Sequence, residues 1–227
     1  MRTVIRGMGE LCITAGLIVM LFVTYELWGT GRYTQGQQDR LQDEMMHSWR
    51  AAPSAAGKVT TEKVKLGKGL AVIRIPRFGD DYRFVVVEGV TRADLRKGPG
   101  HYPGTALPGQ VGNFVVSGHR TTYSAPFNRL GELDRGDEIL IDTRDRQYVY
   151  TVTDRKIVKP SAVEVTAPVP FHPKRRPTER LLTLTTCHPK YSAAERMIIF
   201  GELARTLPRV PAGTGTGGAG AAAPAGG

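Results

Sequence analysis

The sequence predicts an all-β domain, a barrel or a sandwich, that follows one N-terminal membrane-spanning helix. An apolar run near the N-terminus is close to the length that crosses a bilayer. From residue 68 onward the chain changes to short segments rich in β-branched and aromatic residues, each bounded by Gly, Pro or Asp. The 227 residues allow one ordinary domain with appendages.

The apolar run is LCITAGLIVMLFVTYELW, residues 11–28, with one charged side chain near its end. Arg2 and Arg6 lie in the first ten residues, which predicts a cytoplasmic N-terminus. Tyr25 and Trp28 fall where aromatic side chains line the outer membrane interface. A cleaved signal peptide is the alternative, but WGTGRYTQG lacks the small-residue cleavage pattern. We therefore expect an uncleaved, single-pass anchor with the domain outside the cytoplasm.

The segments that flank the predicted domain are polar or of low complexity. Residues 29–67 are expected to form an extracytoplasmic stalk and linker. Within it, Leu41, Met45 and Trp49 share one face of a possible short helix, which we expect to lie against its own domain. Residues 206–227, rich in Ala, Gly and Pro, cannot bury enough surface to offset chain entropy and are predicted to be disordered.

The folded domain is expected to span residues 68–205. Seven or eight short strands over about 135 residues are typical of one barrel or sandwich. Two polar stretches, TRADLRKG and APFNRLGEL, are typical of single short helices. The predicted strands are GLAVIRIPR, YRFVVVEGV, NFVVSGHR, DEILIDT, QYVYTVTDRKIV, RLLTLTTC and RMIIFGEL.

Charge and cysteine content narrow the class of protein. Lys and Arg number 31 against 21 Asp and Glu, so the net charge of +10 favours anionic surroundings such as lipid head groups or wall polymers. The chain carries no zinc-finger or helix-turn-helix signature, which argues against nucleic acid. Its two cysteines are Cys12, in the membrane run, and Cys187. They cannot pair, so Cys187 is an intermolecular partner or a reactive thiol.

Cys187 ends the strand-like run RLLTLTTC and precedes a turn. Strand alternation separates Leu182 and Leu184 from Thr183, Thr185 and Cys187. The leucines are expected to face the core, and the other three side chains to line a semi-polar groove. An inert structural cysteine is the alternative, although it would sit more naturally on the leucine face.

A thiol must ionise to attack, and it needs a cationic neighbour such as His or Arg. His188 adjoins Cys187 and so points to the opposite face of the strand. His47 lies in the stalk, and His172 lies in the exposed-looking run FHPKRRP. His101 and His119 remain, and His119 directly follows the strand-like run NFVVSG. The alternative for each is an ordinary surface or capping residue.

Arg196 opens the apolar strand RMIIFGEL, where alternation puts it on the face of Ile198 and Phe200. An arginine there requires an acidic partner or an anionic ligand, and acyl transfer needs such a donor for the oxyanion. A strand-end arginine that reaches solvent is the alternative. The Gly/Pro-rich run GPGHYPGTALPGQVG matches neither of the phosphate-binding patterns GxxxxGK(S/T) and GxGxxG followed by a helix. It is therefore expected to be a structured loop.

Taken in order, these pieces resemble the sortases. GPGHYPGTALPGQVGNFVVSGHR, then FNRLGELDRGDEI, then LTLTTCHP and Arg196 match the family across the predicted domain. The loop GPGHYPGTALPG and the run TLTTCHP are most similar to class E, or class D, enzymes of high-GC Gram-positive bacteria. The resemblance implies an eight-stranded β-barrel tethered to the cell membrane.

The resemblance also implies an activity, a cysteine transpeptidase. Cys187 would cleave an LAxTG- or LPxTG-type sorting signal between Thr and Gly through a thioacyl-enzyme. His119 would protonate the leaving amine and later take a proton from an amine of lipid II or peptidoglycan. Arg196 would bind the substrate backbone and stabilise the oxyanion. No metal or cofactor is implied, and the candidates for further substrate contacts are Thr186, Tyr102, Tyr123 and His101.

Within the family, class E enzymes prefer LAxTG signals. The chain lacks the DPW or DPF lid motif and the second apolar segment of pilin-polymerising enzymes, so protein anchoring is favoured over pilus assembly. Pilin polymerisation and a catalytically silent wall-binding module are the alternatives. An L,D-transpeptidase would need a SxGCxR-like box, whereas His188 and Pro189 follow Cys187 here, and a papain-like enzyme would place its cysteine at a helix start.

Overall fold

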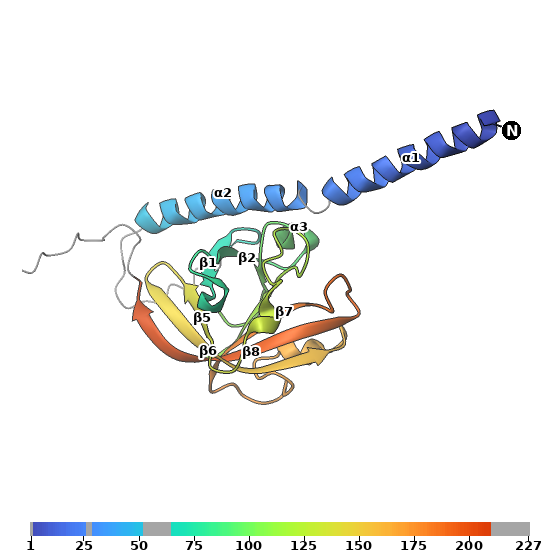
Figure 1. Cartoon of the computed structure of the whole chain (residues 1–227). Coiled ribbons are helices and arrows are strands. Elements are labelled where there is room, and N and C mark those ends of the chain that lie inside the picture. The colour runs from blue at the N-terminus through green and yellow to red at the C-terminus, as the bar shows by residue number, and fades with distance from the viewer. Residues whose placement is uncertain (1, 26–28, 52–64, 210–227) are drawn as a thin grey trace, which may run out of the picture.

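A computed structural model of the chain describes residues 2–25, 29–51 and 65–209. Two long helices precede a closed β-barrel (Figure 1). The barrel order is β1-β2-β3-β4-β7-β8-β6-β5, which confirms the predicted eight-stranded all-β fold. Closure removes exposed sheet edges, which is how a single sheet of this size avoids aggregation.

The two predicted short helices are present in reduced form. The stretch TRADLRKG forms a four-residue α-helix, and APFNRLGEL forms a 3-10 turn, because each lies in a tight connection between strands. The helices are α1 (Arg2–Thr24), α2 (Thr30–Ala51) and α3 (Arg92–Leu95), with 3-10 turns η2 (Pro76–Phe78), η3 (Leu130–Glu132) and η4 (Val163–Thr166). The strands are β1 (Gly69–Arg74), β2 (Arg83–Glu88), β3 (Gly100–His101), β4 (Gly112–Ser117), β5 (Glu138–Asp142), β6 (Arg146–Val158), β7 (Arg180–His188) and β8 (Glu195–Pro208).

The barrel interior is filled by the alternate apolar residues of its strands. Leu182 and Leu184 on β7 face it together with Phe114 and Val116 on β4, all of them buried in one cluster. Full burial of such a side chain contributes about 1.5–3 kcal/mol each, so this cluster fixes which face of every strand points inward. The leucine face of β7 is the core face, as the alternation predicts.

Strand β8 runs further than the predicted domain end at residue 205. The long strand β6 supplies partners beyond that point, pairing Tyr148 with Thr206 and Arg146 with Pro208. Residues 206–208 were expected in the disordered tail, but this backbone pairing places them in the sheet. Residues 210–227 lie outside the described part of the chain.

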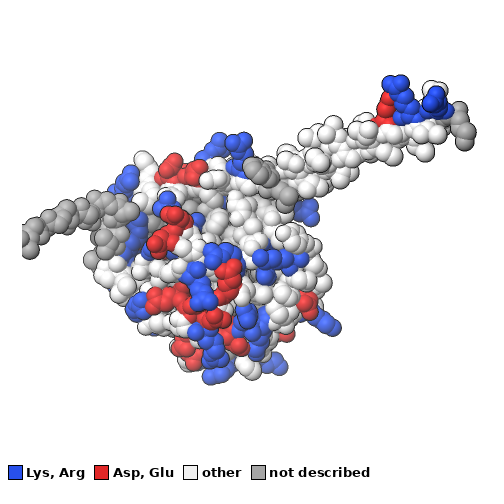
Figure 2. Space-filling model, viewed as in Figure 1, with Lys and Arg blue, Asp and Glu red and all other residues white. Residues whose placement is uncertain are grey.

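Helix α1 projects away from the barrel (Figure 1) and has no buried residue. It is long and apolar enough to span a membrane, and its surface is almost free of charge except at the N-terminal end (Figure 2). The helix begins at Arg2, well before the expected start at residue 11, and Trp28 lies outside the described residues. By length and composition it is a candidate single-pass anchor.

Helix α2 packs along the outside of the barrel rather than standing free as a stalk. Leu41 and Met45 are buried against Val85 and Val87 of β2, with Trp49 at the edge of the same cluster. These are the apolar residues whose spacing predicted a helix lying against its own domain. The helix is longer than expected, however, and covers 22 residues.

Gln38 of α2 binds backbone that the barrel leaves unpaired. Its side-chain oxygen accepts a hydrogen bond from the Val85 amide at 2.6 Å, and its side-chain nitrogen donates to the carbonyls of Val85 (3.0 Å) and Lys97 (2.8 Å). Strand β2 pairs with β3 only at Val87 and Glu88, so Val85 has no strand partner on that side. Gln38 takes the place of that missing strand.

Gln38→Ala is expected to lower the free energy of unfolding by about 1–3 kcal/mol, because it leaves buried backbone groups without hydrogen-bond partners. Gln35→Ala is the matched control, since it makes the same change in helix propensity at an exposed position of α2. Urea denaturation of the full chain in detergent measures both. Equal stability of the two variants would contradict this role for Gln38.

Candidate active site

Cys187 and Arg196 face each other across neighbouring strands. Cys187 lies near the end of β7 and is the direct partner of Arg196 at the start of β8. Cys187 is a half-buried free thiol, while Cys12 lies exposed on α1. The hairpin therefore brings together two of the three residues that the sequence singled out.

His119 is brought to the same end of the barrel by β4. Strand β4 runs parallel to β7, and the register pairs Ser117 with Thr185. The pairing continues one step further, because the Gly118 amide donates to the Thr185 carbonyl at 3.1 Å. The next residue of this chain segment, His119, therefore emerges beside the end of β7 that carries Cys187.

Only glycine fits at position 118, between the strand and His119. A Cβ atom there would lie 2.6 Å from the ring of Phe127, which packs beneath the turn. The Phe127 amide donates to the His119 carbonyl at 3.0 Å and closes the loop that follows. The sequence SGHR thus reflects a close approach between this backbone and an aromatic side chain of the core.

The imidazole of His119 is mostly buried, and its Nε2 atom has no hydrogen-bond partner within the described structure. Its Nδ1 atom lies 3.4 Å from the Thr122 hydroxyl, and its ring lies 5.0 Å from that of Tyr123. Burial lowers the pKa of His119, and the nearby positive charge of Arg96 lowers it further. Both effects favour the neutral imidazole, whose Nε2 atom has no hydrogen-bond partner among the described residues.

Arg196 has no carboxylate partner among the residues that the structure describes. Its guanidinium donates through Nη1 to the carbonyls of Ala193, in the turn before β8, and of Glu195, the first residue of β8, both at 2.9 Å. These contacts are local and exposed, so little energy holds the side chain in them. The cation is available for an anionic group that forms near Cys187.

Two of the four residues expected to contact substrate are instead internal. His101 is 1% exposed, with Nδ1 2.6 Å from a Glu88 carboxylate oxygen and Nε2 3.1 Å from the Ala106 carbonyl. Thr186 is 2% exposed, and its hydroxyl donates to the Gly118 carbonyl at 2.8 Å. In this structure His101 anchors the Gly/Pro-rich loop, and Thr186 ties β7 to the turn before His119. Substrate contact by either residue stays a prediction.

Tyr102 and Tyr123 are half-buried and remain predictions for substrate contact. The Tyr123 ring lies between His119 and the Arg96 guanidinium, which is 5.6 Å from its centre. Tyr123, Ser124 and Ala125 all have left-handed backbone, with φ of 52°, 60° and 43°. Such a run is costly for residues other than glycine and persists only where its surroundings hold it.

Helix α2 supplies part of what holds this loop. The Ser124 hydroxyl donates to the Gly31 carbonyl at 3.0 Å, and the Thr34 hydroxyl donates to the Arg96 carbonyl at 2.8 Å. The first turns of α2 therefore contact both the loop after His119 and Arg96, the residue that caps the C-terminus of α3. No pattern in the sequence signals these contacts.

The expected semi-polar groove is partly filled away from Cys187. Thr183 is fully buried, and its hydroxyl donates at 2.8 Å to Asn113, whose amide donates to the carbonyls of Val165 and Ala167. The connection between β6 and β7 thus covers this part of the outer face. Beside it lies a pocket of about 230 Å³, lined by Thr153, Asp154, Lys156, Pro170, Phe171, Leu181, Leu182, Phe200 and Gly201.

Arg120 is the residue that sequence reasoning missed. Its side chain is 7% exposed, and its Nη1 atom donates to the Cys187 carbonyl at 3.2 Å. Burial lowers the pKa of Arg120, and negative charge on Cys187 opposes this effect. The only sequence signal was its position directly after His119.

Known proteins are similar to this chain in sequence and in fold. The family model described as Sortase domain matches residues 73–204. Sortase SrtE1 of Streptomyces coelicolor is 34% identical over 90% of this chain, which spans only 58% of that relative's length. Sortase SrtE2 of the same organism is 30% identical over 88% of this chain and 81% of its own. The solved SrtF sortase from Corynebacterium diphtheriae is 34% identical, with a TM-score of 0.64 over 72% of this chain and 96% of that one.

The barrel and the matched domain define a cysteine transpeptidase, an enzyme that transfers an acyl group through a cysteine thiol. The chain belongs to the sortase family, and the class E relatives agree with the resemblance of its loop and TLTTC sequences. Within the described residues, no group of three or more His, Cys, Asp or Glu side chains could hold a metal ion.

Arg96→Gln is expected to raise the pKa of His119, because it removes the positive charge that disfavours the imidazolium. In the wild-type chain the NMR titration of His119 should have its midpoint below the ordinary histidine value of about 6.5. In the variant the midpoint should move toward that value.

Arg92→Gln is the matched control, since it removes the same charge from an exposed position of α3. In this control variant the titration midpoint of His119 should equal that of the wild type. Added salt should reduce the difference in midpoint between the two variants. An equal shift in both variants would show that net charge, not the position of Arg96, sets the pKa.

Proposed function

We propose that this chain is a membrane-anchored sortase that uses Cys187, His119 and Arg196 to attach secreted proteins to the cell wall. It would cleave a C-terminal LAxTG- or LPxTG-type sorting signal between Thr and Gly and join the Thr carbonyl to an amine of lipid II or peptidoglycan. The observation that supports this proposal is that the chain segments carrying the three residues share one end of the barrel, where β4 and β7 end and β8 begins.

The first half of the reaction forms a thioacyl-enzyme. The Cys187 sulfur attacks the Thr carbonyl carbon as the thiol proton passes to Nε2 of neutral His119, which has no competing partner. Arg196 leaves its turn carbonyls and donates to the oxyanion that develops. The C–N bond then breaks, and His119 returns its proton to the leaving glycine amine.

The second half transfers the acyl group to the wall precursor. The acceptor amine attacks the thioester carbonyl, again with Arg196 on the oxyanion. His119 takes a proton from the amine nitrogen and passes it to the departing Cys187 thiolate, which restores both groups. One amide bond is broken and one is formed, so the reaction requires no cofactor and no energy source.

The proposed location of the reaction is the extracytoplasmic surface of the cell membrane. Helix α1 would span the bilayer with Arg2 and Arg6 on the cytoplasmic side. Only a few residues separate α1 from α2, which packs against the barrel. The site would therefore stay close to the membrane, where a lipid-linked acceptor and a newly secreted substrate meet.

Cys187→Ala and His119→Ala are each expected to reduce cleavage of a fluorogenic sorting-signal peptide by at least about 10³-fold, since each removes a group that changes covalent or proton bonding in the reaction. Cys187→Ala should also abolish labelling of the extramembrane thiol. Melting curves should show both variants folded.

The controls are the other cysteine and the neighbouring histidine. Cys12→Ala should leave cleavage unchanged because Cys12 lies on α1. His188→Ala should retain most activity, although its Nδ1 atom is also buried without a partner, because adjacent strand residues point to opposite faces. Retained cleavage in Cys187→Ala, or its loss in His188→Ala alone, would refute the assignment.

The class E resemblance favours LAxTG over LPxTG as the signal. Two peptides that differ only at the second residue should differ in kcat/KM by about 10-fold or more, since this ratio reports discrimination between substrates. A triglycine or diaminopimelate acceptor, added separately, should convert hydrolysis into transpeptidation. A faster reaction with LPxTG would overturn the predicted preference while leaving the enzyme class intact.

A further inference from the structure

We propose that Arg120 is a positioning residue that fixes the end of β7, and with it Cys187, against the loop that carries His119. The proposal rests on the proposed function, because it takes Cys187 and His119 as the reacting pair. It concerns how the fold holds these two groups in one geometry, and it assigns Arg120 no contact with substrate.

The carbonyl of Cys187 points to a place where the sheet has no strand left. The Thr185 carbonyl points toward β4 and accepts the Gly118 amide at 3.1 Å. Carbonyls two residues apart on a strand point the same way, so the Cys187 carbonyl points toward β4 as well. Strand β4 has already ended at Ser117, and the next backbone donor of the ladder is absent.

The side chain of Arg120 fills this gap. Its Nη1 atom donates to the Cys187 carbonyl at 3.2 Å, in place of a ladder amide. Its Nε atom donates to the Asn128 carbonyl at 3.1 Å, so the planar guanidinium is fixed at two points. Nη1 also lies 3.5 Å from the Met197 sulfur on β8. A charged donor makes each of these carbonyl contacts stronger than a neutral one would be.

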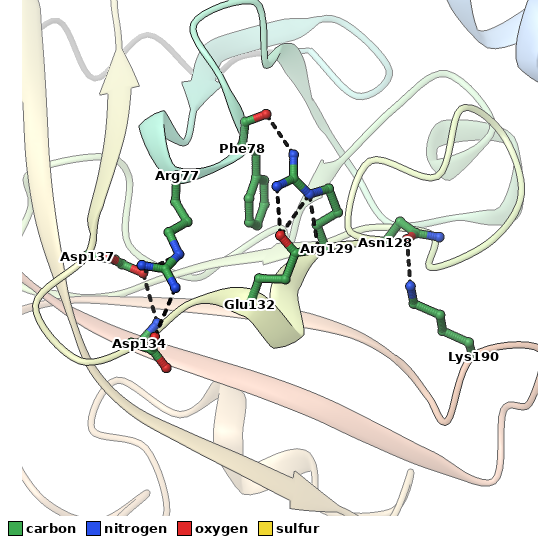
Figure 3. Close-up of polar contacts among 8 residues, drawn as sticks. All are labelled: Arg77, Phe78, Asn128, Arg129, Glu132, Asp134, Asp137 and Lys190. Carbon is green, nitrogen blue, oxygen red and sulfur yellow. Dashed lines mark hydrogen bonds and ion pairs between the residues drawn. The ribbon is translucent and has the colours of Figure 1, made fainter.

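Asn128 extends the same network to the turn after Cys187. Its side-chain nitrogen donates to the Arg120 carbonyl at 2.9 Å, while its own carbonyl accepts from Arg120. Its side-chain oxygen accepts from Lys190 at 2.9 Å, a contact drawn in Figure 3. Arg120 and Asn128 therefore connect the end of β7 at Cys187 and the turn at Lys190 to the chain segment that directly follows His119.

Burying the guanidinium of Arg120 costs desolvation free energy, and packing of the barrel alone does not require a charged side chain at this position. Arg120 is 7% exposed and has no ion pair with a carboxylate among the described residues. A buried cation without a carboxylate is expensive, and an apolar residue of similar size would be cheaper if packing were its only purpose. This cost is consistent with a role in which Arg120 holds the end of β7 in a fixed position relative to the loop after His119.

The test compares Arg120→Lys and Arg120→Met with the wild-type chain, in detergent, using the sorting-signal peptide. Loss of the fork should move Cys187 relative to His119 and lower kcat by about 10–100-fold, because misplacement of about 1 Å can cost that much. KM should stay within about two-fold, since Arg120 does not touch the bound peptide. Rates are expressed per folded enzyme from melting curves.

Arg129→Lys is the matched control. Arg129 lies in the same loop and binds the Phe78 carbonyl and Glu132, but neither Cys187 nor Asn128 (Figure 3). It should alter stability without changing kcat. Asn128→Ala, which keeps Arg120 but removes its reciprocal partner, should lower kcat in the same direction by a smaller factor, and it decides the test if the Arg120 variants do not fold.

Each result has one meaning. A lower kcat with unchanged KM in the Arg120 or Asn128 variants, and not in Arg129→Lys, supports the positioning role. A lower melting temperature with unchanged kcat, a raised KM with unchanged kcat, or equal losses in Arg129→Lys overturn it. If the wild type cleaves no sorting peptide, or Cys187→Ala still does, the proposed function fails instead.

Discussion

The parallel pairing of β4 with β7 is the constraint on which the rest of the site depends. It aligns the strands from Gly112 beside Arg180 to Ser117 beside Thr185, so both strands end at the same edge of the barrel. His119 and Cys187 emerge there because each follows the last paired positions. A one-residue slip of β7 would turn Cys187 toward the core and bring Leu184 out. The packing of Leu182 and Leu184 inside the barrel therefore also sets the direction in which the thiol points.

Most of the fold could be predicted because its signals are local. Apolar alternation, turn residues and the length of the first helix are properties of neighbouring residues, and they predicted an all-β domain, the core face of β7 and the candidate anchor. The choice of an eight-stranded barrel over a sandwich came from the family resemblance. Cys187, His119 and Arg196 were found differently. Strand periodicity left a purely structural role open for each of these residues. The ordered sequence motifs of the family then favoured a catalytic role over it. The pairing of Cys187 with Arg196 then follows from the short turn between β7 and β8.

The parts that the sequence missed depend on contacts between a side chain and a distant backbone. Gln38 replaces a strand beside β2, and Arg120 replaces a ladder amide beside β7. Neither need is visible until the sheet is closed and the unpaired groups are known. The same limit hid the internal contacts of His101 and Thr186, which look like site residues in the sequence because they adjoin the motifs. Their polar atoms are used to satisfy buried groups of the domain itself.

The charges around the end of β7 also follow from burial. Burial lowers the pKa of both His119 and Arg120. Because their ordinary values are far apart, this shift favours the neutral imidazole of His119, while the guanidinium of Arg120 stays charged. The end of β7 is thus flanked by a neutral base and a permanent buried cation, with a second cation, Arg196, near the surface. A neutral His119 can accept the thiol proton, which a charged imidazole could not. In the proposed mechanism, the negative charge that Cys187 gains when that proton leaves would compensate the buried guanidinium, so the cost of burying Arg120 would fall in the reacting state.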